Sequence, residues 1–266
     1  MIDLHAHPIA GIDDGVRDDD EAVEFCRIAV ADGITTLVAT PHIREGMFPN
    51  RRAAILEGLE SLRERLRQEG VGLNLAPGAE IYLEPDLVAR LRAGDYLTLN
   101  DGGRYLLLEL PTRHLPAGVE EIIYQLRLEG LTPVLAHPER IQPFQEDSGR
   151  LARLVELGAL SQVTGGSLLG QFGTQALHAA RALLKDGLVH VLASDAHNNG
   201  ARAPRLRQAV EEAAALVGEG AARRLVLEVP QAILAGQEVE ASVPAPPQEQ
   251  PRRGGWLDWL RGLGRA

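Results

Sequence analysis

Short apolar runs alternate with longer amphipathic segments along most of this sequence, and this alternation constrains the fold more than any other feature. Seven apolar runs predict strands, and the segments between them have helical periodicity. The expected strands are Ile2–Leu4, Ile34–Ala39, Gly72–Ala76, Tyr105–Leu108, Thr132–Ala136, Leu160–Val163 and Leu188–Ala193. The expected helices include Asp18–Asp32, Arg51–Glu69, Pro85–Ala93, Val119–Glu129, Arg150–Leu157, Gln171–Lys185 and Arg202–Leu216. Strands that alternate with helices predict a parallel, barrel-like α/β fold.

Composition and charge limit the function. The chain has 266 residues, 45% of them hydrophobic, which fits one soluble domain with a substantial core. It contains 37 acidic and 27 basic residues, for a formal net charge of −10. Because nucleic-acid binding depends on a basic face, this balance argues against a nucleic-acid partner. Residues 1–5 resemble no signal peptide and no segment approaches a membrane span, so we expect a cytoplasmic protein.

Three familiar catalytic motifs are missing from the sequence. Lys185 is the single lysine and follows Leu184 instead of glycine, which excludes a Walker A loop. Cys26 has Asp32 six positions later, where a cysteine-phosphatase loop needs arginine, so we expect a small buried residue on a helix. Ser167 lacks the closing glycine of a hydrolase nucleophile elbow.

Metal-ligand types of residue follow six of the predicted strands. The carboxyl ends of parallel barrel strands converge on one face, so these side chains should share a pocket. Residues two apart in an extended segment face the same side, which lets His5 and His7 hold one ion, and Asp195 and His197 repeat that spacing. The candidates are His5, His7, His42, Glu80, Glu109, His137, Asp195 and His197, with Asp14 added from a loop.

This candidate set holds five histidines and four carboxylates, which exceeds the needs of one four- to six-coordinate ion. We therefore expect two or three ions bridged by carboxylates. Nitrogen and oxygen donors without sulfur suit Mn, Fe, Zn or Mg. Three histidines lie outside the pattern: His178 and His190 are expected on the surface or in packing, and His114 at the pocket rim.

From about residue 236 the composition changes. Residues 236–251 are rich in proline and glutamine and predict an exposed linker. Residues 252–266 contain Trp256 and Trp259, and the apolar side chains of 256–263 could line one helical face. Such a face could dock peripherally on the inner membrane, on a partner or on another subunit of an oligomer. A tail that folds onto its own domain or stays disordered is the open alternative.

The motifs around these residues resemble the polymerase-and-histidinol-phosphatase (PHP) superfamily. Within it they are similar to the bacterial tyrosine-protein phosphatases of capsule and exopolysaccharide gene clusters, and the match extends in order from Met1 to about Leu216. The motifs are His5-Ala6-His7, Gly11-Ile12-Asp13-Asp14-Gly15, Ala39-Thr40-Pro41-His42, Gly78-Ala79-Glu80-Ile81, His137-Pro138-Glu139-Arg140 and Ala193-Ser194-Asp195-Ala196-His197-Asn198.

The resemblance implies a PHP-type distorted (β/α)7 barrel, here residues 1–235, with a trinuclear site that commonly holds manganese. It implies dephosphorylation of the tyrosine-rich tail of a bacterial tyrosine kinase. By position, the ligands would be the nine residues named above, and Arg140 and Arg202 would hold the phosphate. The sequence departs from the family pattern at Ile43, where a second histidine is frequent, and at Ala203, where proline is frequent.

We therefore expect metal-assisted hydrolysis of a phosphotyrosine ester. Two alternatives remain open from the sequence. One is a small-molecule phosphatase of the same superfamily, such as a histidinol-phosphate phosphatase. The other is a non-catalytic scaffold that docks a polysaccharide-synthesis kinase through its tryptophan-bearing tail.

Overall fold

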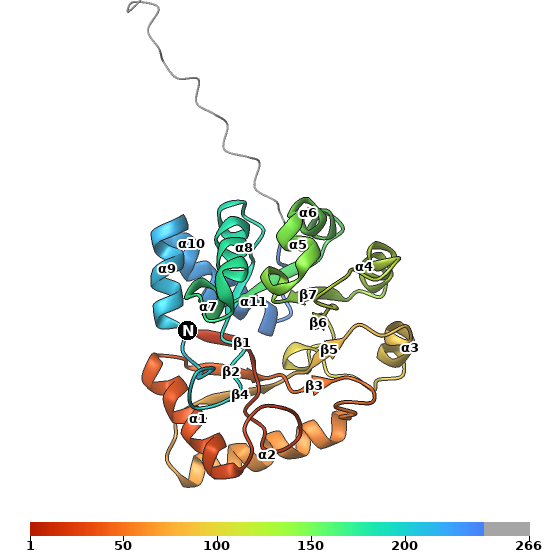
Figure 1. Ribbon diagram of the computed structural model, residues 1–266. Helices are drawn as coiled ribbons and strands as arrows, with labels where there is room; N and C mark the ends of the chain where they lie inside the picture. Colours follow the sequence, from red (N-terminus) through yellow and green to blue (C-terminus); the bar gives the residue numbers. More distant parts are fainter. Residues whose placement is uncertain (242–266) are drawn as a thin grey trace, which may run out of the picture.

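The structure is a computed structural model that describes residues 1–241. Nine parallel strands and the helices between them form one α/β unit (Figure 1). The strands are β1 Ile2–Ala6, β2 Thr36–Ala39, β3 His42–Ile43, β4 Asn74–Pro77, β5 Glu80–Tyr82, β6 Tyr105–Glu109, β7 Thr132–Ala136, β8 Leu160–Thr164 and β9 Val191–Ala193.

Helices follow most strands, as the alternation of the sequence predicts. The longer ones are α1 Asp19–Asp32, α2 Arg52–Gln68, α4 Val119–Leu128, α6 Gly149–Glu156, α8 Gly173–Lys185 and α9 Arg207–Val217. The short helices are α3 Leu87–Arg92, α5 Gln142–Glu146, α7 Gly165–Leu168, α10 Glu219–Arg223 and α11 Val229–Leu234. Single turns are η1 Leu99–Asp101, η2 Pro138–Arg140 and a π-helical η3 Arg224–Glu228.

The strands are divided between two parallel sheets, in the orders β1-β2-β4 and β3-β5-β6-β7-β8-β9. Pro41, which has no N–H to donate, lies between β2 and β3, and Gly78 lies between β4 and β5. At Gly78 a Cβ would lie 2.8 Å from the Val38 side chain, so glycine permits the close approach of the two segments. The segments at β1 and after β9 also meet, because Asp195 N–H donates to His5 O and His7 N–H to Ala196 O.

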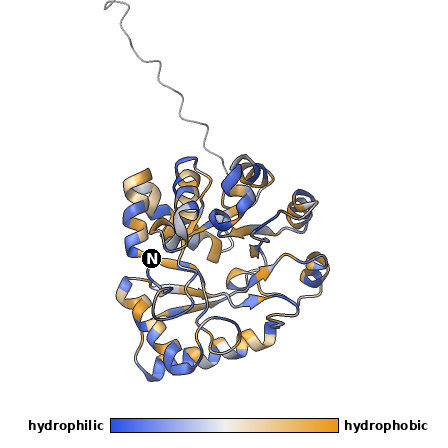
Figure 2. Ribbon diagram, in the orientation of Figure 1, coloured by the Kyte–Doolittle hydropathy of each residue, from blue (hydrophilic) through white to orange (hydrophobic). Residues whose placement is uncertain are grey.

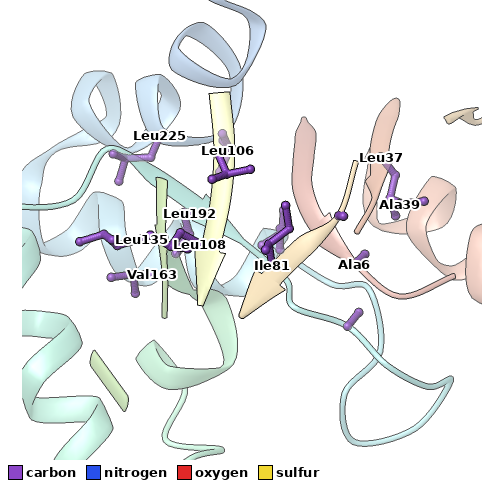
Figure 3. Close-up of a cluster of buried hydrophobic side chains, with 14 of the residues drawn as sticks. Ala6, Leu37, Ala39, Ile81, Leu106, Leu108, Leu135, Val163, Leu192 and Leu225 are labelled. Atoms are coloured by element: carbon purple, nitrogen blue, oxygen red, sulfur yellow. The ribbon is translucent and has the colours of Figure 1, made fainter. Parts of the chain in front are cut away.

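Alternate residues along the strands face two different apolar clusters. In β6, Leu106 and Leu108 belong to the large cluster (Figure 3). That cluster also contains side chains from helices such as α1 and α2. Tyr105 and Leu107 belong to a smaller cluster with Ile2, Leu4 and other strand residues. Glu109 has the same parity as Tyr105 and Leu107, so it continues their face at the carboxyl end of the strand. Apolar residues accordingly line the strands and the inner helix faces, with polar residues outward (Figure 2).

The expected α/β class and single domain are confirmed, and the expected barrel is corrected in one respect. The strands do not form one continuous ladder, since β1, β2 and β4 make one sheet and the other six strands a second. The second and third expected strands correspond to β2 and β4, and the short strands β3 and β5, which follow Pro41 and Gly78, were not expected. All seven expected strands are found, and Thr132–Ala136 has the expected bounds.

Two expected elements begin later than the apolar pattern indicates. Helix α9 begins at Arg207 instead of Arg202, because Pro204 disfavours helical conformation in the residue before it. Strand β9 begins at Val191 instead of Leu188, because Leu188 N–H is bound to Leu183 O at the end of α8. The expected linker and tail lie almost wholly outside the described residues, which end at Ala241. Among residues 1–241, no helix has the length and apolar character that a membrane crossing needs.

His190 lies just before β9 and is buried, which agrees with the packing role expected for it. Its Nδ1 accepts the backbone N–H of Ser161 at 3.1 Å, which leaves the ring proton on Nε2. Burial lowers the pKa of His190 to about 4. The folded protein therefore keeps this ring neutral while the unfolded chain protonates it near pH 6.5.

We expect His190 to make the protein less stable in mild acid. A histidine with a lowered folded-state pKa loses stability as pH falls below its unfolded pKa, here by about 2 kcal/mol between pH 7.5 and pH 5. In His190→Gln this pH dependence should be smaller by that amount, as measured by urea unfolding at both pH values. Equal pH dependence in the two proteins would contradict the assignment.

Candidate metal centre

The ends of the strands, together with the loop after β1, bring all nine expected ligands to one place. His5 lies in β1, His42 begins β3, Glu80 begins β5, and His42 and Glu80 are register partners in adjacent strands. The others end or follow their strands, as Glu109 does in β6. Eight of the nine fall into three overlapping groups whose potential ligand atoms lie within 4.8 Å of one another. The ninth, His137, places Nε2 2.9 Å from Glu80 Oε1.

The first group is fully buried and consists of His5, His7, Glu80 and Asp195. The Nε2 atoms of His5 and His7 lie 3.3 Å apart. Glu80 Oε2 is 3.0 Å from the first nitrogen and 3.5 Å from the second. Asp195 Oδ1 is 3.5 and 3.7 Å from the same two atoms. Two nitrogens and two carboxylate oxygens therefore surround one point in the interior.

The second group lies nearer the surface and consists of His7, Asp14, His42 and His197. The Asp14 side chain is 52% exposed, and its Oδ1 lies 3.4 Å from His42 Nε2 and 3.4 Å from His197 Nε2. The third group joins His42, Glu80 and Glu109, with His42 Nδ1 3.1 Å from Glu80 Oε2 and 3.7 Å from Glu109 Oε2. Shared residues link the groups, with His7 in the first two and Glu80 in the first and third.

Three histidines are oriented by hydrogen bonds at Nδ1. His5 Nδ1 donates to Gln162 Oε1 at 2.8 Å, and His197 Nδ1 donates to the Asp195 carbonyl at 3.0 Å. His7 Nδ1 pairs with Asp13 Oδ2 at 2.8 Å. When such a ring is neutral and carries its proton on Nδ1, it presents the Nε2 lone pair to the site, which is the arrangement of a metal-bound histidine.

These orientations supply a fit test for metal ions. Two imidazole lone pairs 3.3 Å apart, with two carboxylate oxygens beside them, repel one another unless positive charge lies among them. Imidazole and carboxylate donors without thiolate suit divalent Mn, Fe, Zn or Mg. The residues present therefore fit divalent metal ions.

The pKa shifts express the same demand for positive charge. Burial acts to lower the pKa of His7, but the Asp13 carboxylate overrides it and raises the pKa to about 10. Burial acts to raise the pKa of Glu80, yet His5 and His42 hold it well below its ordinary value. Burial and the nearby Glu80 carboxylate raise the pKa of Glu109 to about 8. Protons on these side chains therefore offset the negative charge of the buried carboxylates, and divalent ions would supply the same positive charge.

Two site residues have backbone conformations that are uncommon outside glycine. His137 has φ 36° and Asp195 has φ 51°. Left-handed conformations in such residues cost on the order of 1–3 kcal/mol and persist where surrounding structure fixes them. His137 comes directly after β7 and Asp195 two residues after β9, and both side chains contact other residues of the site.

The two expected arginines lie at the edge of the centre and both reach Asp195. Arg140 Nη2 forms an ion pair with Asp195 Oδ2. Arg202 Nη2 donates to Asp195 Oδ1 at 2.9 Å and to its carbonyl at 3.0 Å. The ring of Phe172 lies beside both, with its centroid 4.6 Å from Arg140 Cζ and 5.6 Å from Arg202 Cζ.

Sequence reasoning missed several residues of this site. Asp13 and Gln162 orient His7 and His5, and Asp3 accepts the backbone N–H of Ser194 at 3.0 Å. Asp13 is adjacent to Asp14 in the Gly-Ile-Asp-Asp-Gly stretch, and nothing in the spacing separates their roles. Gln162 could have been found from its position in β8, because it lies two residues after the buried Leu160 and so shares its face of the strand. His178 is exposed on α8 as expected, and His114 is exposed in the loop after β6, outside the three groups.

The fold and this donor set define the class: α/β proteins that bind metal ions at the carboxyl ends of parallel strands. The chain belongs to the capsular polysaccharide synthesis family CpsB/CapC, whose model matches residues 1–235. The resemblance expected from the motifs is confirmed.

Named relatives agree with this family. Tyrosine-protein phosphatase YwqE of Bacillus subtilis is 42% identical over 198 residues, covering 74% of this chain and 78% of that protein. Tyrosine-protein phosphatase CpsB of Streptococcus pneumoniae is 32% identical over 246 residues, covering 89% and 99%. A chain from the crystal structures of YwqE and CpsB, metal-dependent tyrosine phosphatases, aligns with a TM-score of 0.86 and 37% identity, covering 90% of this chain and 96% of that one.

The hydrogen bond between Asp13 and His7 should strengthen metal binding. We expect Asp13→Asn to lower Mn²⁺ affinity roughly 10–100-fold, because outer carboxylates fix the ring and raise its basicity. Affinity is measured by titration against a competing chelator. The control is Asp20→Asn, which removes a carboxylate that is 88% exposed. Unchanged affinity in Asp13→Asn would remove this role from the account.

Proposed function

We propose that this protein is a metal-dependent protein-tyrosine phosphatase that acts on the phosphotyrosine tail of a bacterial tyrosine kinase. The observation that carries the proposal is the approach of Arg140 and Arg202 to Asp195, directly beside three groups of metal-ligand side chains. Arginines beside a metal centre suit a phosphoryl group, because guanidinium groups and metal ions both stabilise the negative charge on its oxygens. The relatives YwqE and CpsB are tyrosine-protein phosphatases, which supports the same reaction.

The nine candidate side chains would hold three divalent ions, manganese by preference, with Fe, Zn or Mg as alternatives. One ion would correspond to each of the three groups, and His137 would complete the set through its position beside Glu80. When bound, such ions lower the pKa of water toward neutrality and offset negative charge on the phosphoryl oxygens.

The protein's own residues would bind and orient the ester. A guanidinium can hold two phosphoryl oxygens at once, and the two arginines approach Asp195 through different oxygens, Oδ2 for Arg140 and Oδ1 for Arg202. Asp195 keeps both cations in place before substrate arrives. The Phe172 ring packs against both guanidiniums and limits their motion.

The leaving group makes modest demands on the protein. Tyrosine has an ordinary pKa of about 10, so tyrosinate departs more readily than an alkoxide. Positioning and charge stabilisation are therefore the main tasks of the site. This favours phosphotyrosine over histidinol phosphate, whose leaving oxygen is an alcohol.

The biological setting follows from the family. We place the protein in control of capsular or extracellular polysaccharide synthesis, in the cytoplasm and peripherally at the inner membrane. The two sheets would be parts of a PHP-type distorted (β/α)7 barrel over residues 1–235, followed by a linker, 236–251, and a tail, 252–266. Residues 256–263, through which the protein would dock on a membrane, a partner or another subunit, lie outside the described residues.

Substrate comparison tests the function. The Mn²⁺-loaded protein should hydrolyse p-nitrophenyl phosphate and a phosphotyrosine peptide, and should act far more slowly on histidinol phosphate. EDTA should abolish the activity and Mn²⁺ restore it, as followed by phosphate release. No hydrolysis of the peptide, or faster hydrolysis of histidinol phosphate, would overturn the proposal.

Substitution of one arginine tests its part in the reaction. Arg140→Gln should lower kcat/KM for the phosphotyrosine peptide by roughly 10²-fold, because a fixed donor to the developing charge is lost. Metal content should stay at the parent level, which separates lost substrate contact from lost metal. Arg150→Gln, which alters a 54% exposed arginine on α6, is the control. A kcat/KM near the parent value in Arg140→Gln would contradict this role.

A further inference from the structure

A second hollow lies beside the metal centre, at the carboxyl ends of β8 and β9. It has a volume of about 350 Å³ and is bordered by residues near α7, the start of α8 and the start of α9 (Figure 1). Phe172 and Arg202 form its border with the metal centre, since the same two residues contact the Asp195 and Arg140 region. From there the lining continues to Arg205 and Arg207.

Among the arginines of this hollow, Arg205 is the one whose guanidinium has neither an ion pair nor a hydrogen bond to a residue in the described range 1–241, and its side chain is exposed. Arg202 is paired with Asp195, and Arg207 donates to the Asp32 carbonyl. Many surface arginines of this acidic chain form an ion pair with a carboxylate, as Arg27 does with Glu69 and Arg65 with Asp20. The chain has 37 acidic and 27 basic residues, so an uncompensated guanidinium beside the candidate site adds positive charge there against the overall negative charge.

Arginines outnumber carboxylates among the residues that line the hollow. Arg207 Nη2 donates to the Asp32 carbonyl at 3.0 Å. The Asp32 carboxylate is occupied, because its Oδ2 accepts the backbone N–H groups of Leu206 and Arg207 at 2.6 and 2.9 Å. Glu211 is the other acidic residue in the lining and is exposed on α9. Three guanidiniums and two carboxylates therefore line the hollow. Arg202 is already paired with Asp195 and the Asp32 carboxylate caps α9, which leaves the Arg205 guanidinium available to an incoming anion.

We propose that this hollow is a subsite for an anionic side chain, a carboxylate or a phosphate, that neighbours the reacting phosphotyrosine in the substrate peptide. The inference rests on the proposed function, which places the phosphotyrosine at Arg140 and Arg202. Arg202 belongs to both the site and the hollow, so one peptide can occupy the two together. Arg205 then selects peptides with acidic or phosphorylated neighbours, through charge-assisted hydrogen bonds.

Binding of hydrolysis-resistant peptides tests the subsite. Each peptide carries difluorophosphonomethyl-phenylalanine in place of phosphotyrosine and is flanked on both sides by Glu, Gln or Lys. A further peptide has a second phosphonate in one flanking position. Affinity for the Mn²⁺-loaded protein is measured by fluorescence anisotropy, so the readout does not depend on turnover.

The Glu-flanked peptide should bind the parent protein roughly fivefold more tightly than the Gln-flanked one, as expected for a partly exposed charge pair. In Arg205→Gln this preference should vanish. In Arg205→Glu the Lys-flanked peptide should become the tighter ligand, a reversal that a merely structural role would not produce. A preference that appears with the second phosphonate but not with Glu would identify phosphate as the natural anion.

Arg224→Glu is the matched control. Arg224 is an exposed arginine without an ion pair to a described residue, and it borders a different hollow, near His190 at the amino end of β9. It should keep the parent's preference. A preference for the anionic peptides that is identical in the parent and both Arg205 variants would overturn the subsite, as would a parent that binds neither the Glu-flanked nor the doubly phosphonate peptide more tightly than the Gln-flanked one. Hydrolysis of p-nitrophenyl phosphate by the parent reports separately on the proposed function.

Discussion

The demand of buried carboxylates and imidazoles for positive charge is the constraint on which the rest of this structure depends. Glu80 is fully buried and Asp195 nearly so, and an isolated buried carboxylate is strongly disfavoured. Each is surrounded by histidine nitrogens, and Asp195 also by two guanidiniums. The fold tolerates these groups in its interior because they compensate one another, and the donor set fits divalent ions.

The architecture explains how so many ligand-type groups reach one place. Parallel strands present their carboxyl ends to the same edge, and inward parity then selects which side chains enter the site. The hydrogen bonds of Gln162 and Asp13 fix the rings of His5 and His7 from behind. Left-handed turns at His137 and Asp195 aim two more side chains inward. Strand geometry gives the position, and local hydrogen bonds give the orientation.

Much of this arrangement could be predicted from the sequence. Apolar runs located all seven expected strands, and the residues after them include every member of the three ligand groups except Asp14. Asp14 was added as a candidate ligand from the loop that follows the first strand. The strands and the proximity of these side chains could be predicted because hydrophobic periodicity is a local property of the chain and because parallel strands converge at their carboxyl ends.

Other features depend on contacts between distant segments and could not be predicted in the same way. The breaks that create β3 and β5 follow from the packing of Val38 against Gly78 and from the missing N–H of Pro41. The pairing of Gln162 with His5 joins residues 157 positions apart. The place of Phe172 between two arginines has no signature in spacing. Net charge, likewise, describes the surface of the whole chain and gave no information on the local balance at the strand ends.

The central claim is that the nine strand-end side chains form one centre for three divalent ions. Anomalous diffraction at the manganese absorption edge, from crystals of the Mn²⁺-loaded protein, measures this directly. The account predicts three anomalous peaks, contacted between them by His5, His7, Asp14, His42, Glu80, Glu109, His137, Asp195 and His197. A site with no peak or a single peak, or peaks away from these side chains, would contradict it.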